Sequence, residues 1–298
     1  MRSNRPMPVR RALMLAALVS GAGAASAGVI RHDVDDSLYQ SFAQESQFDA
    51  VGLLLLNGGS TTCSGTLIGE NWVLTAAHCV DEGTTNAQWV TSTAFGTAAE
   101  IFLHPDWIEN DFTGGNDIAL IRLTAPVTTV QAASLFWGSN EIGQMGRSVG
   151  YGRTGTGFQG DVINDGAKRA GTNMIDVFGT AQGWDADILL TDFDNPIDTS
   201  DSIWGDDTPT DLEMQVGAGD SGGALFVDDG HGGIAIAGVT TFIASVDGNS
   251  NAGYGDISAY TRVSSYLPWI EKVSGIPSPG VMLVLLGGAG MARRRRSV

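Results

Sequence analysis

Basic residues are scarce in the body of this 298-residue sequence. Of its 16 Lys and Arg, four lie within residues 1–11 and four form the run Arg293–Arg296, whereas all 33 Asp and Glu lie between these two ends. A body this acidic repels nucleic acid and anionic membranes, so nucleic acid is not an expected partner. Solvation of a secreted protein explains the acidity, because no compact motif of metal ligands accompanies it. We therefore predict no metal site and no cofactor.

Cysteine is equally scarce, and Cys63 and Cys79 are the only two. In an exported protein, two cysteines are the minimum for one disulfide bridge. A zinc site is the alternative, but it would need further ligands beside these two.

Long helical patterns and internal repeats are missing between residues 28 and 275. Hydrophobic residues make up 43% of the chain, enough for a sizeable core, while 41 glycines and only 8% aromatics favour short strands and tight turns. Residues 155–210 are rich in Gly, Asp, Asn and Thr and predict long surface loops. One helix is predicted over residues 263–273. The strand patterns, which favour an all-β barrel or sandwich, cover residues 50–56, 63–68, 72–75, 117–123, 223–227, 233–243 and 258–263.

The N-terminus has the pattern of a secretory signal peptide. Residues 1–11 are basic, residues 12–19 are apolar, and Ala25-Ser26-Ala27 places small residues at positions −3 and −1 of a cleavage site. We expect a signal peptide of residues 1–27, cleaved before Gly28, and a single domain of residues 28–275. The export machinery is then a partner, and the mature protein lies in the periplasm, the cell envelope or the extracellular space.

Residues 276–298 have the pattern of a second targeting segment. The turn residues 277–280 precede 12 apolar residues, 281–292, and then the four Arg. This order resembles the Pro-Glu-Pro (PEP-CTERM) sorting signals of Gram-negative bacteria, which a membrane peptidase removes, although Ser278 replaces their Glu. Twelve residues are short for a membrane span of about 20. We expect transient membrane association and removal by a sorting peptidase; a weak permanent anchor and a tail helix packed on the domain are alternatives.

Three separated motifs supply the groups that acyl transfer to a serine requires. The motif Gly-Asp-Ser-Gly-Gly, residues 219–223, allows a sharp turn and brings the N–H groups of Gly219 and Ser221 together as an oxyanion hole. His78 lies among small residues that allow close packing of its ring. Asp117 begins an apolar strand, where a carboxylate needs a partner such as an imidazole N–H. Each motif alone also fits a structural role, but together they predict a nucleophile, its base and the acid that orients the base.

The pattern Gly-x-Ser-x-Gly around Ser221 also occurs in α/β-hydrolases. That fold places its acid and then its His after the Ser, and the only His that follows here is His231, ten residues on. Repeating βαβ units are missing as well, and both observations count strongly against this alternative.

The three motifs Thr-Ala-Ala-His-Cys, Asp-Ile-Ala-Leu and Gly-Asp-Ser-Gly-Gly resemble those of the chymotrypsin/trypsin-like serine proteases, in that family's order. The resemblance covers about residues 50–273. It implies an all-β fold of two six-stranded antiparallel β-barrels with a C-terminal helix and a catalytic cleft between the barrels. In this cleft His78, Asp117 and Ser221 would be the triad, and Gly219 would complete the oxyanion hole.

Further segments resemble the same family. Cys63 and Cys79 match the pair whose disulfide restrains the catalytic His, and closing this short loop would stabilise the fold by roughly 3 kcal/mol. Gly150-Tyr151-Gly152 resembles a Gly-Trp-Gly segment. The stretches 260–263 and 266–273 resemble the last strand and the terminal helix.

The resemblance also implies which residues contact substrate. Thr241, Phe242 and Ile243 match the strand that pairs with the substrate backbone. Gln215 matches the floor of the primary specificity pocket, where an uncharged side chain offers no ion pair to Lys or Arg. Ile243 and Ser258 replace pocket glycines and should narrow the slot. We therefore expect cleavage after small or medium uncharged residues.

The activation motif of the family, Ile-Val-Gly-Gly, is missing. In the family a new N-terminal amine pairs with the Asp before the nucleophile, here Asp220. Family spacing places that N-terminus near Ser37, whereas signal cleavage places it at Gly28, about nine residues earlier. Three possibilities follow: the Gly28 amine reaches Asp220 by another route, a later cut occurs, or another group satisfies Asp220.

The sequence thus predicts a secreted, monomeric serine endopeptidase that acts on protein or peptide substrates. The alternative function is a non-catalytic protease-fold binding module of the cell envelope, and a third is an envelope structural protein sorted by its tail. The third leaves the triad motifs unexplained.

Overall fold

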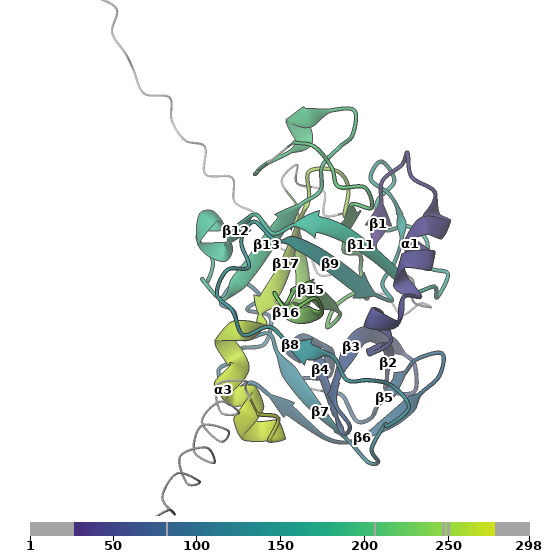
Figure 1. Ribbon diagram of the computed structural model, residues 1–298, viewed down its shortest axis with the longest axis vertical. Helices are drawn as coiled ribbons and strands as arrows, with labels where there is room; N and C mark the ends of the chain where they lie inside the picture. The colour runs from purple at the N-terminus through teal and green to yellow at the C-terminus, as the bar shows by residue number, and fades with distance from the viewer. Residues whose placement is uncertain (1–26, 82, 206, 246–247, 249–250, 278–298) are drawn as a thin grey trace, which may run out of the picture.

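The computed structural model describes residues 27–277, apart from residues 82, 206, 246–247 and 249–250. Within this part of the chain two β-structures are stacked on one another, with few helices around them (Figure 1). The predicted sorting segment, beyond Pro277, and nearly all of the predicted signal peptide lie outside the described residues. No helix of the described part is long and apolar enough to cross a membrane.

The first β-structure is a closed barrel of six strands in the order β2-β3-β4-β7-β6-β5. Its antiparallel pairs bring alternate apolar residues inward, and Leu54, Leu67, Val73 and Leu120 are fully buried there. Closure removes the free sheet edges, and it confirms the first predicted barrel. The six strands are β2 (Val51–Leu56), β3 (Thr61–Gly69), β4 (Trp72–Thr75), β5 (Ala87–Val90), β6 (Phe95–Leu103) and β7 (Ala119–Leu123).

The second β-structure is an eight-stranded sheet that runs β11-β9-β15-β16-β17-β13-β12, with β8 beside β16. It is an open half-barrel, so the prediction of a second six-stranded barrel was wrong in this respect. In the described chain β12, at one edge of this sheet, has only two residues, and β14 pairs with β1 in a separate sheet. The strands are β8 (Ser134–Leu135), β9 (Met145–Gly150), β11 (Arg169–Met174), β12 (Val177–Phe178), β13 (Ile188–Asp192), β15 (Ala224–Asp228), β16 (Ile234–Ala244) and β17 (Ile257–Arg262).

The stretch 155–210 contains more regular structure than the predicted loops. Strands β11 and β13 were missed because their polar residues are buried rather than exposed. The guanidinium of Arg169 is 1% exposed and donates to Asp36 and Asp165, and Asn173 donates to the Asp192 carbonyl at 2.6 Å. When buried polar groups are hydrogen-bonded to one another, a buried strand need not have the run of apolar residues by which it is recognised in a sequence. The stretch also contains the two-residue strands β10 (Gly155–Thr156) and β12, and 3-10 helices at Gly179–Gln182 and Thr199–Asp201.

Each end of the described chain packs against the half of the molecule that lies farther from it in the sequence. Strand β1 (Val29–Ile30) pairs with β10 (Gly155–Thr156) and β14 (Met214–Gln215), and helix α1 (Asp36–Ala43), not predicted, packs against β11 of the second sheet. Helix α3 (Val263–Ser274), predicted over 263–273, instead lies beside the first barrel (Figure 1), where Tyr266 and Ile270 join its core. The N-terminal residues therefore complete the second half, and the C-terminal helix completes the first.

Candidate active site

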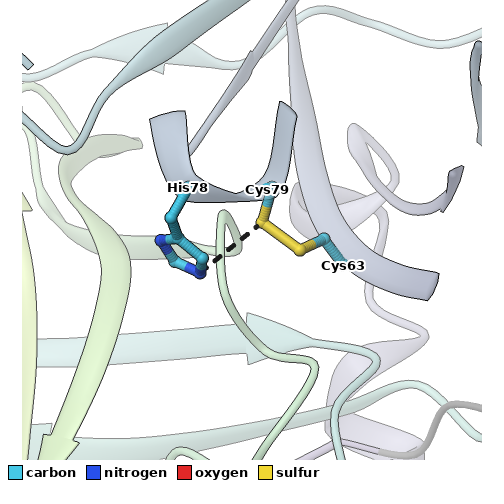
Figure 2. Close-up of side chains that lie close together, drawn as sticks. All are labelled: Cys63, His78 and Cys79. Carbon is cyan, nitrogen blue, oxygen red and sulfur yellow. Dashed lines mark hydrogen bonds between the residues drawn. A yellow bond between two sulfur atoms is a disulfide. The ribbon is translucent and has the colours of Figure 1, made fainter. Parts of the chain in front are cut away.

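The disulfide predicted between Cys63 and Cys79 is confirmed, and it holds the segment that carries His78. It joins β3 to the short helix α2 (Ala77–Val80) across a sequence separation of 16 residues. Figure 2 shows His78 beside this bridge, with its Nε2 atom 3.8 Å from Cys79 Sγ. Within the described residues these three are the one group of potential metal ligands that lie close together, but disulfide sulfurs are not thiolates. The zinc alternative therefore fails.

The imidazole of His78 is held by the carboxylate of Asp117. His78 Nδ1 lies 2.7 Å from Asp117 Oδ2, and the His78 backbone N–H donates to Oδ1 at 2.9 Å. Asp117 is fully buried, and the hydroxyl of Thr241 also donates to its Oδ2. Because Asp117 only accepts, Nδ1 carries the proton and Nε2 is left as the basic nitrogen. The geometry gives His78 the tautomer that a general base needs.

Burial and charge act on His78 in opposite directions. Burial lowers the pKa of His78, but the charge of Asp117, the hydrogen bond from Nδ1 and the charge of Asp81 outweigh it. The pKa of His78 is therefore raised above its ordinary value, which stabilises an imidazolium. A group that takes a proton during reaction and returns it needs this property.

Side-chain hydroxyls of two neighbouring elements hold the backbone at Asp117. Thr261 in β17 donates its hydroxyl to the Asp117 carbonyl at 3.0 Å, and Tyr266 in α3 accepts the Asn116 N–H at 2.9 Å. Asn116 has a φ of 64°, a left-handed conformation that Asn tolerates better than most residues. The second half of the molecule thus positions an acid that belongs to the first.

Ser221 lies on a tight glycine loop packed against the His78 segment. Gly222 has a φ of 79°, and a side chain there would collide with Thr75 and with the Ser64 carbonyl. The Ser64 N–H donates to the Ser221 carbonyl at 2.8 Å. Among the described residues Ser221 Oγ makes no hydrogen bond to His78 Nε2. Such bonds often tighten only in the substrate complex, so the open arrangement is compatible with a nucleophile and its base.

Asp220, next to Ser221, is a buried carboxylate surrounded by backbone N–H groups. Gly152 donates to its Oδ1 at 2.7 Å, while Gly28 and Gly217 donate to Oδ2 at 2.9 and 2.8 Å. Burial raises the pKa of Asp220 to about 6, against the lowering effect of these bonds. Of the two positions considered for the new N-terminus, Gly28 is thus the one whose nitrogen contacts Asp220, whereas Ser37, where family spacing places the new end, lies in helix α1.

The residues predicted for the specificity pocket come together on three strands. Ser258 in β17 donates its hydroxyl to Gln215 Oε1, and both side chains are fully buried. Ser258 is also the register partner of Ile243 in β16. The ring of Phe242 lies 5.1 Å from that of Trp184 and 6.2 Å from that of Phe112, measured between ring centroids. The polar pair Gln215–Ser258 and the half-buried Ile243 are thus neighbours.

Sequence reasoning missed two residues at this site. The ring of Phe112 lies edge-on to the His78 ring, with centroids 5.3 Å apart. Ser64 donates its hydroxyl to the Gly219 carbonyl at 3.3 Å and accepts the Tyr151 N–H at 3.0 Å. Ser64 follows Cys63 directly, so the disulfide motif was the signal that could have pointed to it.

Comparisons with known proteins agree with this geometry. The Trypsin family model matches residues 40–270. Chymotrypsin-like elastase family member 1 of Rattus norvegicus is 31% identical over 246 residues, covering 75% of this chain and 83% of the relative. The protein of the same name in Canis lupus familiaris is 31% identical over 249 residues, covering 75% and 86%. The chain belongs to the trypsin family of chymotrypsin-like serine proteases, and it is a serine endopeptidase.

Proposed function

We propose that this endopeptidase works through an acyl-enzyme on Ser221, with His78 as general base and Asp117 as the acid that orients it. The observation that carries the proposal is the bond of 2.7 Å between His78 Nδ1 and the buried Asp117 carboxylate, beside the loop that presents Ser221. The expected partners are protein or peptide substrates, and the chemistry requires no cofactor.

In the first half of the reaction His78 Nε2 takes the proton of Ser221 Oγ as this oxygen attacks the peptide carbonyl carbon. The N–H groups of Gly219 and Ser221 hold the resulting oxyanion. The imidazolium, stabilised by Asp117, then gives its proton to the leaving amine, and the peptide bond breaks. In the second half, His78 takes a proton from a water molecule as its oxygen attacks the acyl carbon. The bond between this carbon and Ser221 Oγ then breaks, the imidazolium returns the proton to Oγ, and the acid leaves.

The alternative is a non-catalytic binding module with the same fold, and a serine-directed fluorophosphonate separates the two. The protein that starts at Gly28 should be labelled on Ser221, as found by peptide mapping, and a Ser221→Ala variant should not be labelled. Absence of labelling in the folded protein would favour the binding module.

We also propose that cleavage before Gly28 supplies the amine partner of Asp220. In a continuous chain the Gly28 nitrogen is an uncharged amide, 2.9 Å from Asp220 Oδ2. Cleavage after Ala27 converts it into an ammonium group beside a buried carboxylate. A charge-assisted hydrogen bond contributes about 1.5–3 kcal/mol, which favours the Asp220 conformation that shapes the Ser221 loop.

A chain that begins at Ser26 is therefore expected to have a kcat/KM about 10- to 100-fold below that of a chain that begins at Gly28. Kinetics on a peptide substrate measure this ratio, and N-terminal sequencing verifies each start. Asp220→Asn should remove the difference between the two chains. Equal activity of the two unmodified chains would show that the amine is not needed, and N-terminal sequencing of active natural protein would reveal a later cut.

The specificity residues favour cleavage after small or medium uncharged side chains. Gln215 offers no charge, and Ile243 and Ser258 occupy positions where an open pocket has glycine. The relatives named above are elastases by name, which agrees with this proposal.

Profiling on a peptide library tests the specificity. We expect preference for small aliphatic residues before the scissile bond, and Ile243→Gly should extend the preference to larger side chains, because one extra methylene is worth about 1–3 kcal/mol in such a pocket. A dominant preference for Arg or Lys in the unmodified enzyme would contradict the proposal.

We also propose that both ends of the chain are removed by proteolysis. Removal of residues 1–27 on export and of the tail by a sorting peptidase would leave a soluble, monomeric domain in the periplasm, the envelope or the medium of a Gram-negative cell. Intact-mass measurement of protein recovered from cell fractions would identify both ends.

A further inference from the structure

The carboxylate of Asp161 contacts the loop that carries the proposed oxyanion hole. Asp161 Oδ2 accepts the backbone N–H of Ala218 at 3.0 Å, although the two residues are 57 positions apart. Ala218 directly precedes Gly219, whose N–H is assigned to the oxyanion hole above. Asp161 lies in a loop between β10 and β11 and has no part in the mechanism described so far.

A second contact fixes the next peptide unit. The Arg153 N–H donates to the Ala218 carbonyl at 2.7 Å. The Ala218 carbonyl and the Gly219 N–H belong to the same planar peptide and point in opposite directions. A bond that fixes the carbonyl on one side therefore directs the Gly219 N–H to the other. Asp161 and Arg153 together hold both polar groups of Ala218.

Asp161 is itself held in place. Its backbone N–H donates to the Asn251 carbonyl at 2.9 Å, and Thr154 and Ile163 pair as a β-bridge across the base of its loop. A side chain at Gly217 would collide with the Arg153 carbonyl and lie close to the Asp161 side chain, so the two loops are tightly packed there. Gly219 has a φ of 100°, a conformation that glycine adopts without the strain of a side chain.

The negative charge of Asp161 does not explain why an acidic residue lies beside this loop. Burial raises the pKa of Asp161, while the bond from Ala218 and the charge of Arg153 lower it. A negative charge near a developing oxyanion would oppose catalysis, since like charges repel. The useful property of this side chain is then its acceptor oxygen, which an amide of the same shape retains.

We propose that Asp161 is a positioning residue for the oxyanion hole: its acceptor oxygen holds Ala218 so that the Gly219 N–H faces the carbonyl attacked by Ser221. The inference rests on the mechanism proposed above. It predicts that the loss of the acceptor weakens transition-state binding while substrate binding changes little.

The matched variants are Asp161→Leu, which keeps the shape without an acceptor, and Asp161→Asn, which keeps an acceptor without the charge. Loss of one oxyanion-hole donor costs about 10²- to 10³-fold in kcat, so a displaced donor should cost Asp161→Leu at least about tenfold, with KM little changed. Asp161→Asn should retain most of the activity. Gln159→Ala, an exposed residue of the same loop, is the control for disturbance of the loop.

Affinity for a peptide boronate, a transition-state analogue, provides a second readout. It should fall in parallel with kcat in Asp161→Leu, while the affinity for a product peptide stays the same. Asp161→Ala, measured beside it, serves if Asp161→Leu does not fold, as judged by thermal unfolding. The inference is overturned if the variants without an acceptor match Gln159→Ala, or if Asp161→Asn is as impaired as Asp161→Leu. Failure of fluorophosphonate to label unmodified Ser221 would instead overturn the proposed mechanism.

Discussion

Replacement of Ser221 by Ala is expected to lower kcat by about 10⁶-fold, while KM for a peptide substrate changes little. The acyl-enzyme route cannot begin without Oγ, whereas the groups that bind substrate remain in place. The loop should keep its conformation, because the contacts that hold it, such as the bond from the Ser64 N–H to the Ser221 carbonyl, use the backbone.

Kinetics at high enzyme concentration, with both proteins quantified by absorbance, measure this loss. A His78→Ala variant is the matched control, since a base and nucleophile that act as one unit should cost about the same singly and together. Retention of more than a small fraction of the activity by folded Ser221→Ala would show that another nucleophile carries the reaction.

Asp117→Asn is expected to lower kcat at neutral pH by about 10⁴-fold. The amide can donate to His78 and so favours the tautomer with its proton on Nε2, where the base must be free. The negative charge that raises the pKa of His78 is also lost. The acid limb of the kcat profile, which lies above the ordinary pKa of His in the unmodified enzyme, should therefore move to lower pH.

The pH profile of kcat on a peptide substrate measures both effects. Thr241→Val is the comparison, because it removes a hydrogen bond to Asp117 while keeping the carboxylate and its charge. A profile of Asp117→Asn that coincides with that of the unmodified enzyme would show that Asp117 does not orient His78.

The candidate catalytic groups could be proposed from the sequence because each lies in a short motif of neighbouring residues, and the structure brings His78 and Asp117 into contact. The glycines around Ser221, the small residues around His78 and the strand after Asp117 adopt the conformations that their sequences favour. That the second sheet stays open could not be predicted in this way, because it depends on pairing between distant strands such as β1 and β14. The residues of β11 were also predicted as a loop, because the strand contains buried polar residues such as Arg169 and Asn173.

The residue near the N-terminus that contacts Asp220 could not be identified from the sequence alone either. Gly28 was considered, but family spacing pointed to Ser37, because helix α1 lengthens the chain between β1 and β2. Asp161 could not have been singled out either, since one acidic residue in a polar loop has no pattern of its own. Its contact with Ala218 follows from the packing of two loops that only the fold brings together.

The packing of each chain end against the opposite half bears on how this enzyme unfolds. Strand β1 and helix α1 complete the half-barrel, and helix α3 completes the closed barrel. If one half were to unfold alone, it would release a terminal segment from the other and uncover the apolar face beneath it. The two halves should therefore unfold in one cooperative transition. A high barrier to partial opening keeps the chain's own peptide bonds out of reach of neighbouring copies of the protease.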